Sequence, residues 1–459
     1  MTVHSEEKHE TDRKDFGIKA TIIPEDDHPI RPGQLDREAL KVLYRLRDAG
    51  YAGYLVGGGV RDLYLGKRPK DFDISTNARP GQIRRLFRNS RTIGRRFRLV
   101  QVFFRGNKII EVSTLRSQSE PDGEGEDTEI LPANNTYGTL EEDAFRRDLT
   151  INSLFYEIED NTIIDYVGGV DDLRNGIVRI VGDPDLRITR DPVRLLRAIR
   201  HSARTGFTID EASYQAIVAH REKLLLCPPS RIRDEIIKDL VSGYSRPWAE
   251  LCIKARVFFT LFPFYEALAS DEAGRQELLA VLGVIDRLHG GRRKKKVPEH
   301  MLIGLLLYPW MKKEHDLLNR ELKGGGYRQL FNDVRSSLDK YVCDRFNIRR
   351  SAKEALTTLY VNMPNFHRFQ KDKKWPKWLK RKSYFKDCSR FSALVAEAEG
   401  RGLAADELFG IQEEARSVAI SQQGRGNGRR QRGGEPAFSM KKGGVFGLRT
   451  SDSPVIPNS

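Results

Sequence analysis

The chain has 459 residues, which is enough for about three domains that each bury their own core. Its 79 lysines and arginines outnumber 64 acidic residues, and a net charge of +15 points to an anionic polymer or membrane surface as partner. The 4 cysteines lack paired spacing, so neither a disulfide framework nor a zinc site is indicated. The apolar runs are too short to cross a membrane. We therefore expect a cytoplasmic protein without a membrane partner.

The N-terminal part of the chain changes character after about thirty residues. Residues 1–30 are polar and mixed in charge, and we expect a flexible segment there. From Leu35 to Leu46 apolar residues recur with helical spacing. This pattern predicts a helix that ends before Gly50.

An apolar run follows and ends in three glycines, Gly57, Gly58 and Gly59. Such a run predicts a buried strand whose backbone then turns tightly, because glycine tolerates conformations that other residues avoid. The main-chain N–H groups of a glycine turn can approach phosphate oxygens. We expect Arg61 and Asp62 to open the next helix.

The segment Asp71-Phe72-Asp73-Ile74 alternates polar with apolar residues. On a strand, both carboxylates would project from one face, about 7 Å apart at their Cα atoms. Two such carboxylates suit phosphoryl transfer by two Mg²⁺ ions that lie roughly 3.5–4 Å apart. The residues alone leave a solvated strand face open as the alternative.

The glycine turn followed by the two aspartates resembles the head motif of the nucleotidyltransferases that extend RNA 3′ ends. This family joins the tRNA CCA-adding enzymes and the bacterial poly(A) polymerases. The resemblance implies that Asp71 and Asp73 are catalytic and bind metal. It also implies nucleotide contacts from Gly57, Gly58, Arg61 and Asp62.

After the acidic strand we expect a short helix that carries Ile83 on its apolar face, with Thr76 or Asn77 as its cap. A hairpin over residues 99–113 should follow. Residues 117–140 lack any periodicity and predict a mobile loop.

Glu111 interrupts the second apolar run of this hairpin. A carboxylate in a strand fit for burial is costly unless it is paired or binds a metal, so Glu111 is the third candidate metal ligand. An edge-strand glutamate that faces water is the alternative. The family carries its third acid on such a strand, and the segment Ile93 to Val100 resembles the poly(A) polymerase branch.

The next motif begins with two arginines and an aspartate. The apolar spacing between Ile151 and Ile158 predicts a helix that shows Asn152 on its opposite side. From the residues alone the arginines could be a solvated helix end. The string resembles the second family motif, which implies contacts to the triphosphate, the ribose and the catalytic centre. The residues concerned are Arg146, Arg147, Asp148 and Asn152.

A basic helix is expected after Pro192, and Asp191 before this proline is typical of an N-cap. Arg194 and Arg197 then fall on one face of the helix. A basic face is usually solvated, yet the segment resembles the motif in which an aspartate and an arginine contact the incoming base. The resemblance therefore implies nucleotide binding by Asp191, Arg194 and Arg197. The family usually has a glutamate where this chain has Arg190.

The segment from Lys371 to Lys382 interleaves cations with two tryptophans. Charge and stacking, the latter typically ~1–3 kcal/mol per base, can hold a single strand of RNA. Alternatively, the tryptophans anchor an exposed helix on a core. The candidate RNA-binding residues are Lys373, Lys374, Trp375, Lys377, Trp378, Lys380, Arg381 and Lys382.

These patterns and the resemblance together predict an α+β protein. We expect a nucleotidyltransferase head over residues 31–165, with a mixed, largely antiparallel sheet, followed by an all-helical neck over residues 166–260. A helical body with the basic RNA-binding region would span residues 261–415. An Arg/Gly-rich tail over residues 416–459 cannot build a core and should be disordered.

The activity that the resemblance implies is template-independent transfer of AMP from ATP to RNA 3′ ends. Mg²⁺ would be the cofactor, pyrophosphate the leaving group, and RNA-decay proteins possible partners. A tRNA CCA-adding or A-adding enzyme is the alternative within the family. An inactive RNA-binding protein is the alternative from another class, against which the intact pair of aspartates argues.

Overall fold

The computed structural model describes residues 19–94, 98–117, 137–290, 295–320, 322, 324–371, 375–405 and 408–411. These residues belong to one compact unit that extends to Arg416. None of the helices in these ranges is long and apolar enough to span a membrane. The expectations for residues 1–18, for most of the 117–140 loop, for Lys373 and Lys374 and for the 416–459 tail lie outside the described residues. The flexible segment expected over residues 1–30 is wrong in its second half, because Thr21–Ile23 form a strand that pairs within the sheet and Ile30 is buried.

Eight strands of the N-terminal part form one sheet in the order β1-β8-β7-β2-β3-β6-β5-β4. They are β1 (Thr21–Ile23), β2 (Gly53–Val56), β3 (Asp73–Thr76), β4 (Ser90–Ile93), β5 (Leu99–Phe104), β6 (Lys108–Thr114), β7 (Phe155–Glu157) and β8 (Thr162–Asp165). Only β3 and β6 run parallel, and the other neighbours in this sheet are antiparallel. The expected mixed, largely antiparallel sheet is confirmed.

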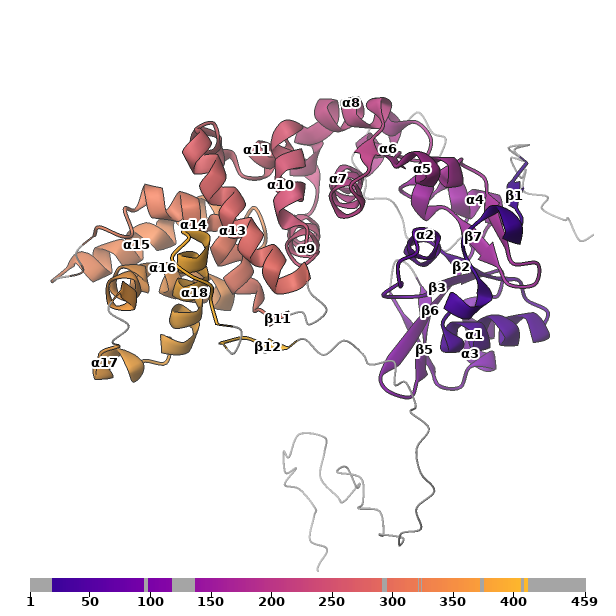
Figure 1. The fold of residues 1–459 in the computed structure, drawn as a ribbon, viewed down its shortest axis with the longest axis horizontal. Helices are drawn as coiled ribbons and strands as arrows, with labels where there is room; N and C mark the ends of the chain where they lie inside the picture. The colour runs from indigo at the N-terminus through magenta and orange to yellow at the C-terminus, as the bar shows by residue number, and fades with distance from the viewer. Residues whose placement is uncertain are drawn as a thin grey trace, which may run out of the picture. The chain divides into compact units, whose positions relative to one another are not determined.

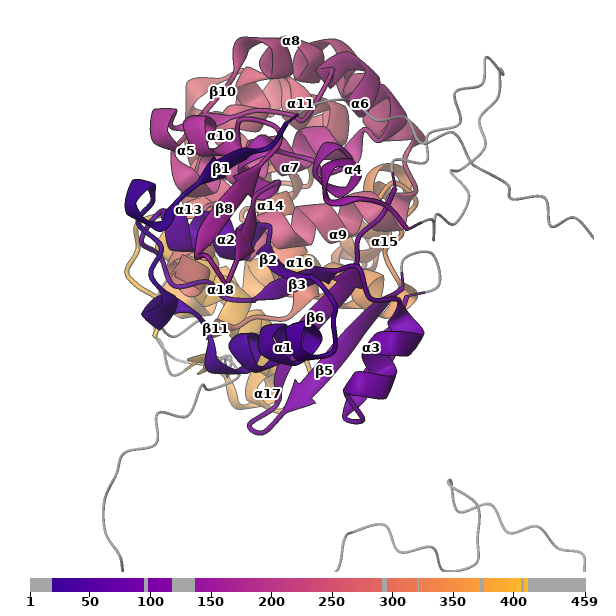
Figure 2. The same cartoon turned by 90° about the vertical axis from the view of Figure 1, so that its right-hand side faces the viewer.

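Two helices cover one face of this sheet. They are α1 (Arg37–Asp48) and α3 (Pro80–Leu86), which lie side by side along the strands (Figure 2). Val42 of α1 and Ile83 of α3 are buried in one core with Val100 and Val112 of the strands. The predicted helix before the glycine turn is thus confirmed, and Asp36 caps it by accepting hydrogen bonds from the main-chain N–H groups of its first turn.

On the opposite face of the sheet, the described residues cover one half. Helix α4 (Leu140–Phe145) packs Ala144 against Val56 of β2 and Phe155 of β7, in a second and smaller cluster. Leu115, directly after β6, completes this cluster. The other half of this face, over β6, β5 and β4, carries the partly exposed side chains described below.

The remainder of the described chain is mainly helical, as expected (Figure 1). Its helices are α5 (Gly169–Asn175), α6 (Pro184–Arg190), α7 (Val193–Thr205), α8 (Glu211–His220), α9 (Pro229–Leu240), α10 (Ser245–Lys254), α11 (Val257–Leu261), α12 (Glu266–Ala269), α13 (Glu272–Gly290), α14 (Glu299–Glu314), α15 (Gly326–Leu338), α16 (Arg350–Lys371), α17 (Lys377–Lys380) and α18 (Phe385–Ala398). Two pairs of two-residue strands interrupt it, β9 (Ile177–Val178) with β10 (Thr208–Ile209) and β11 (Lys295–Lys296) with β12 (Gly410–Ile411).

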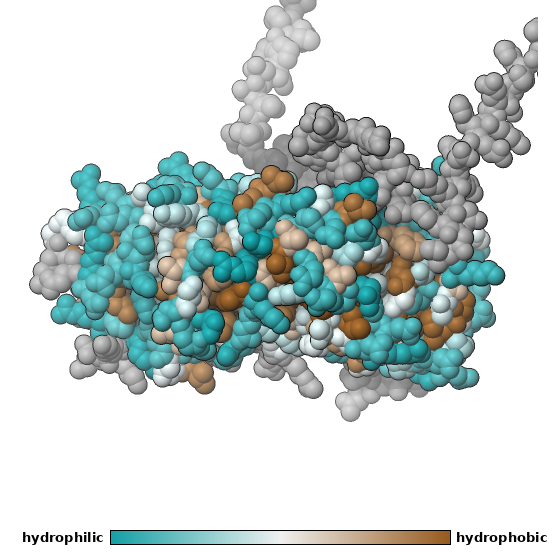
Figure 3. Space-filling model, turned by 90° about the horizontal axis from the view of Figure 1, so that it is seen from above, coloured by the Kyte–Doolittle hydropathy of each residue, from teal (hydrophilic) through white to brown (hydrophobic). Residues whose placement is uncertain are grey.

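Aromatic rings and one buried charge cluster hold these helices together. The ring of Phe258 lies 5.0 Å from that of Phe262 and 5.5 Å from that of Tyr265, measured between centroids. Arg200 of α7 forms ion pairs with Glu235 and with Asp239 of α9, and all three residues are buried. On the molecular face seen in Figure 3, apolar residues are scattered among hydrophilic ones.

Three predictions about helices outside the glycine turn are wrong. The segment after Leu149 forms a short 3₁₀ turn over Thr150–Asn152 and then strand β7, rather than one helix. Leu154, Phe155 and Tyr156 are buried one after another because β7 lies inside the sheet with packing on both faces. Consecutive burial produced apolar spacing that imitates a helix.

The other two concern helix starts. Asp191 lies at the end of α6, and α7 begins after Pro192 without a side-chain cap. Helix α3 begins after Arg79, and neither Thr76 nor Asn77 caps it. Instead Asn77 accepts a hydrogen bond from the N–H of Ala52 through its side-chain oxygen, 3.0 Å away.

Candidate active site

The glycine turn joins β2 to α2 (Gly58–Tyr64). Gly57 has a φ of +69°, a conformation that residues with side chains rarely adopt, so this position needs glycine. Gly58 and Gly59 already belong to the helix, and Arg61 therefore lies in its middle rather than at its start. A Cβ atom on Gly59 would lie only 3.5 Å from the main-chain oxygen of Asp71, so the two halves of the motif are packed together.

The carboxylates lie across neighbouring parallel strands. Strand β3 begins at Asp73, so that Asp71 lies in the connection just before it, and the expectation of both aspartates on one strand is wrong. Asp73 is in register with Glu111 of β6, which is an interior strand and not an edge strand. Gln101 of β5 donates a hydrogen bond from Nε2 to Oε1 of Glu111, 2.9 Å away.

The electrostatics of Asp73 indicate a shortage of positive charge. Loss of water around this carboxylate and repulsion by Glu111 and then Asp71 raise its pKa to about 6, although Arg147 acts in the opposite direction. The described side chains do not include three metal-ligating groups already arranged to hold an ion. Carboxylate oxygens that repel one another nevertheless fit a hard divalent cation such as Mg²⁺ by their chemistry, because the cation would relieve the repulsion.

Two arginines after α4 are held by a carboxylate that the sequence analysis did not single out. Asp143 has no exposed surface and accepts hydrogen bonds from Nε of Arg146, at 2.7 Å, and from Nη2 of Arg147, at 2.9 Å. Burial opposes ionisation of Asp143, but Arg147 and Arg146 outweigh it and lower its pKa. Nη2 of Arg147 also donates to Oγ of Ser75 on β3, 3.3 Å away. Arg147 is thereby fixed beside the strand that carries Asp73.

A buried polar network continues from the head to helix α7. Nη1 of Arg61 donates to Oδ1 of Asn152, 2.6 Å away, and to Nδ1 of His201, 3.1 Å away. An arginine can only donate, so His201 accepts and is neutral here; burial and then Arg61 lower its pKa well below the ordinary value. Asp148 forms an ion pair with Arg197 of α7 at 2.7 Å. Burial would raise the pKa of Asp148, but Arg197, then Arg194 and the main-chain N–H of Leu149, lower it to about 2.

The expected base-contacting pair is engaged with the protein in this structure. Arg194 donates from Nη1 to the main-chain oxygen of Arg147 at 3.0 Å and from Nη2 to that of Arg146 at 3.3 Å. Asp191 forms an ion pair with Arg231 at 2.8 Å, and its carboxylate lies 3.9 Å from Nε of Arg194. Both residues therefore lie next to the arginine pair, and their contact with a base stays a prediction.

The candidate RNA-binding residues in the described range divide into two groups. The ring of Trp375 packs against Phe366 and Phe385, with centroids 5.1 Å and 5.6 Å away, so it anchors the segment as the alternative interpretation proposed. Trp378 is half exposed, which leaves its ring able to stack on a base. The cations that face solvent around it are Lys377, Lys380, Arg381 and Lys382.

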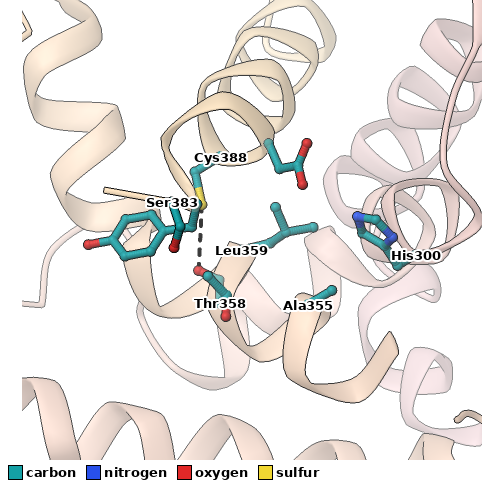
Figure 4. Close-up of a pocket in the computed structure, with 8 residues that line it drawn as sticks. His300, Ala355, Thr358, Leu359, Ser383 and Cys388 are labelled. Atoms are coloured by element: carbon teal, nitrogen blue, oxygen red, sulfur yellow. Dashed lines mark hydrogen bonds between the residues drawn. The ribbon is translucent and has the colours of Figure 1, made fainter. Parts of the chain in front are cut away.

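A pocket of about 200 Å³ lies elsewhere, between α14, α16 and α18 (Figure 4). His300, Thr358 and Cys388 line it, and the Cys388 thiol donates to the main-chain oxygen of Thr358 at 3.7 Å. None of the candidate catalytic residues lines this pocket. The pocket therefore lies apart from the candidate catalytic carboxylates of the sheet.

Comparison with known proteins first defines the class. A family model described as the poly A polymerase head domain matches residues 53–179, and one described as a probable RNA and SrmB-binding site of polymerase A matches residues 206–268. The solved structure of the Bacillus stearothermophilus CCA-adding enzyme in complex with CTP shares the fold, with a TM-score of 0.59 and 21% identity over 81% of this chain and 80% of that chain. The fold and the head domain are those of a nucleotidyltransferase.

More similar relatives then specify the family. Poly(A) polymerase I of Escherichia coli O6:H1 is 41% identical over 317 residues, which cover 67% of this chain and 68% of the relative. The CCA-adding enzyme of Lactobacillus helveticus is 35% identical over 53% of this chain and 58% of the relative. The chain belongs to the bacterial poly(A) polymerase family, so the interpretation as an inactive RNA-binding protein loses its support.

Sequence reasoning missed the residues that hold the site together. Asp143, Gln101 and His201 each bond a candidate residue, yet none belongs to a motif that the sequence analysis quoted as functional. For Asp143 a signal existed, because an aspartate three and four residues before two arginines can pair with both on one helical turn. Gln101 lies opposite Glu111, and this position can be recognised only once the register between β5 and β6 is known.

Proposed function

We propose that the protein adds AMP from ATP to RNA 3′ ends without a template and releases pyrophosphate. The single observation that carries this proposal is that Arg147 donates a hydrogen bond to Ser75, which lies on β3 two residues after Asp73. A triphosphate held by the arginine would present its reacting phosphorus to the carboxylates. The 41% identity to a poly(A) polymerase supports adenylate transfer in particular.

The carboxylates of Asp71, Asp73 and Glu111 would hold Mg²⁺, in line with the raised pKa of Asp73. The bound ions supply electrostatic stabilisation of the charge that develops on the transferred phosphoryl group. The chain's own part in the reaction is positioning, which accounts for most of phosphoryl-transfer catalysis. The side chains that position the nucleotide would be those that the protein already holds in place by hydrogen bonds and ion pairs.

Three groups of residues would share this positioning. Arg146 and Arg147 would bind the triphosphate, with Asp143 fixing both guanidinium groups. Asp148 and Asn152, which lie in the polar network with α7, would surround the ribose. The remaining nucleotide contacts that we propose come from Gly57, Gly58, Arg61, Asp62, Asp191, Arg194 and Arg197.

The C-terminal helices would hold the RNA. Lys377, Lys380 and the half-exposed Trp378 offer charge and a stacking surface to a single strand. We further propose that the enzyme acts in the cytoplasm and marks RNA for decay, with RNA-decay proteins as partners. In this scheme residues 31–165 form the catalytic head, residues 166–260 the neck and residues 261–415 the body.

Addition of CCA or A to tRNA is the second candidate. It is favoured by the likeness of the fold to CCA-adding enzymes, because head and helical part are shared between the two branches. Adenine and cytosine both present an amine next to a ring acceptor, so an aspartate and an arginine can contact either base. The choice of nucleotide is therefore the point on which the two candidates differ.

The proposal is tested with the purified protein, an oligoribonucleotide, Mg²⁺ and labelled ATP. We expect extension of the RNA and release of one pyrophosphate per AMP added. Asp73→Asn should lose the activity, while Asp171→Asn, which changes an acid that is largely exposed on α5, should keep it. Normal extension by Asp73→Asn would remove these carboxylates from the mechanism.

A further inference from the structure

A single row of side chains crosses the sheet at the level of the catalytic carboxylates. The register pairs Asp73 of β3 with Glu111 of β6, Glu111 with Gln101 of β5, and Gln101 with Arg91 of β4. Partners in register project from the same face of a sheet. The row therefore leads from the candidate metal site directly to an arginine on the edge strand.

The same row continues on the other side of Asp73, where it is covered. There Asp73 is in register with Val56 of β2, and Val56 with Phe155 of β7. The guanidinium of Arg147 lies over the ring of Phe155, 5.1 Å from its centroid, and α4 packs on Val56. The groups proposed to bind the triphosphate thus occupy the β2 and β7 side of the carboxylates.

On the β5 and β4 side, the described residues leave side chains exposed. Phe103 of β5 and Ile109 of β6 are in register with one another, two residues from Gln101 and Glu111, so they project from the same face. Phe103 is 38% exposed and Ile109 is 43% exposed, although large apolar side chains on a sheet are normally covered. Arg91 is exposed as well, and within the described ranges no hydrogen bond or ion pair joins its side chain to another residue.

Phosphoryl transfer proceeds with the attacking and leaving oxygens roughly in line, on opposite sides of the reacting phosphorus. If the pyrophosphate leaves toward Arg147, the attacking hydroxyl has to arrive from the side of Glu111. We propose that the open face of β6, β5 and β4 binds the 3′ end of the RNA, with Phe103 and Ile109 against the terminal nucleotide and Arg91 on its phosphate. This inference rests on the proposed function and adds the RNA site of the head.

The chemistry of this face favours a nucleic acid strand as its occupant. An exposed aromatic ring offers a stacking surface that is independent of base identity, and an arginine without an acidic partner offers a phosphate contact. Arg105, in the turn between β5 and β6, adds a second exposed cation next to Phe103. The face continues without interruption from the candidate catalytic carboxylates.

Variants of this face can be compared with matched variants of the covered one. Arg91→Ala and Phe103→Ala remove the proposed contacts. Arg84→Ala on α3 removes another exposed arginine, and Tyr44→Ala on α1 removes an aromatic ring that is 41% exposed. Helices α1 and α3 pack on the opposite face of the sheet, so these controls leave the proposed site intact.

The measurements are RNA affinity by fluorescence anisotropy without ATP, and the KM values for oligo(A) and for ATP during extension. We expect Arg91→Ala and Phe103→Ala each to weaken RNA binding and raise the KM for oligo(A) on the order of tenfold. The KM for ATP should stay within about twofold, since these residues lie away from the triphosphate side. Arg91→Ala should also lower the log-log salt slope of binding by about 0.7, and Phe103→Tyr should restore affinity.

Two results overturn the inference. In the first, Arg91→Ala and Phe103→Ala bind RNA with the same affinity as the two controls and have the same KM for oligo(A). The face would then be a surface for a protein partner and not for RNA. The second is an oligoribonucleotide with a 3′-terminal 4-thiouridine that photocrosslinks only outside residues 90–111. A wild type that binds RNA at this face but adds no AMP would instead contradict the proposed function, because the crosslink does not depend on catalysis.

Discussion

Replacing Asp143 by asparagine tests whether the arginine pair is positioned by this buried carboxylate. Breaking a buried ion pair by removing one partner typically costs ~3–5 kcal/mol. The arginine side chains are 28% and 16% exposed, so water can replace part of the lost interaction and we expect destabilisation of about 2–3 kcal/mol. A loss of about 2 kcal/mol in triphosphate positioning would lower kcat/KM for ATP roughly 30-fold.

The assay combines urea unfolding with steady-state kinetics in both substrates. Glu142→Gln is the matched control, since it removes a charge from the neighbouring position while glutamine can keep the capping bond to the N–H of Thr139. We expect Asp143→Asn to raise the KM for ATP and to leave the KM for RNA unchanged. An equal loss for both substrates, or no loss for ATP in folded protein, would refute the positioning argument.

The pH dependence of stability gives a second readout for Asp143. The folded protein lowers the pKa of this group, so its contribution to stability is present above the unfolded pKa and is lost as pH falls through the folded value. Wild type should therefore lose stability faster than Asp143→Asn below about pH 4. Parallel acid unfolding curves would contradict this sign.

Three further predictions concern other parts of the site and the helical core. Asp73→Asn should lower activity at least ~10³-fold. Because the folded protein raises the pKa of Asp73 to about 6, the ionised carboxylate destabilises the metal-free protein above that pH. The variant without metal should therefore have a slightly higher melting temperature than wild type at pH values above 6, and the same melting temperature near pH 4. Arg194→Ala should raise the KM for ATP and reduce the preference for ATP over CTP, since this side chain holds the main chain of Arg147; equal preferences in wild type and variant would count against it. Asp239→Ala should destabilise the protein by about 3–5 kcal/mol in urea unfolding, because it leaves the buried guanidinium of Arg200 with one partner fewer.

Local sequence patterns correctly predicted the elements whose structure depends on neighbouring residues alone. The glycine turn, the helix before it and the hairpin that carries Glu111 could each be predicted, since positive φ, helical spacing and strand alternation are local properties. The apolar spacing wrongly predicted a helix at β7, because both faces of this strand are buried and its residues do not alternate between polar and apolar. The N-cap pattern also failed at Asp191, whose carboxylate is taken by an arginine forty residues later in the chain.

The supporting contacts could not be predicted from the sequence, because they depend on long-range register. Gln101 faces Glu111 only through the pairing of β5 with β6, and Arg91 joins the same row only through the pairing of β4 with β5. His201 meets Arg61 across 140 positions of the chain. A single sequence identifies the carboxylates and arginines, but not the groups that orient them.

The most direct test of the central claim is a comparison of nucleotides on two kinds of RNA. Labelled ATP or CTP is supplied separately, with a generic oligoribonucleotide and with tRNA that lacks its CCA end. A poly(A) polymerase should incorporate many AMP residues into both RNAs and little CMP into either. Efficient use of CTP on the tRNA, with addition that stops once the CCA end is complete, would contradict the account and identify a CCA-adding enzyme.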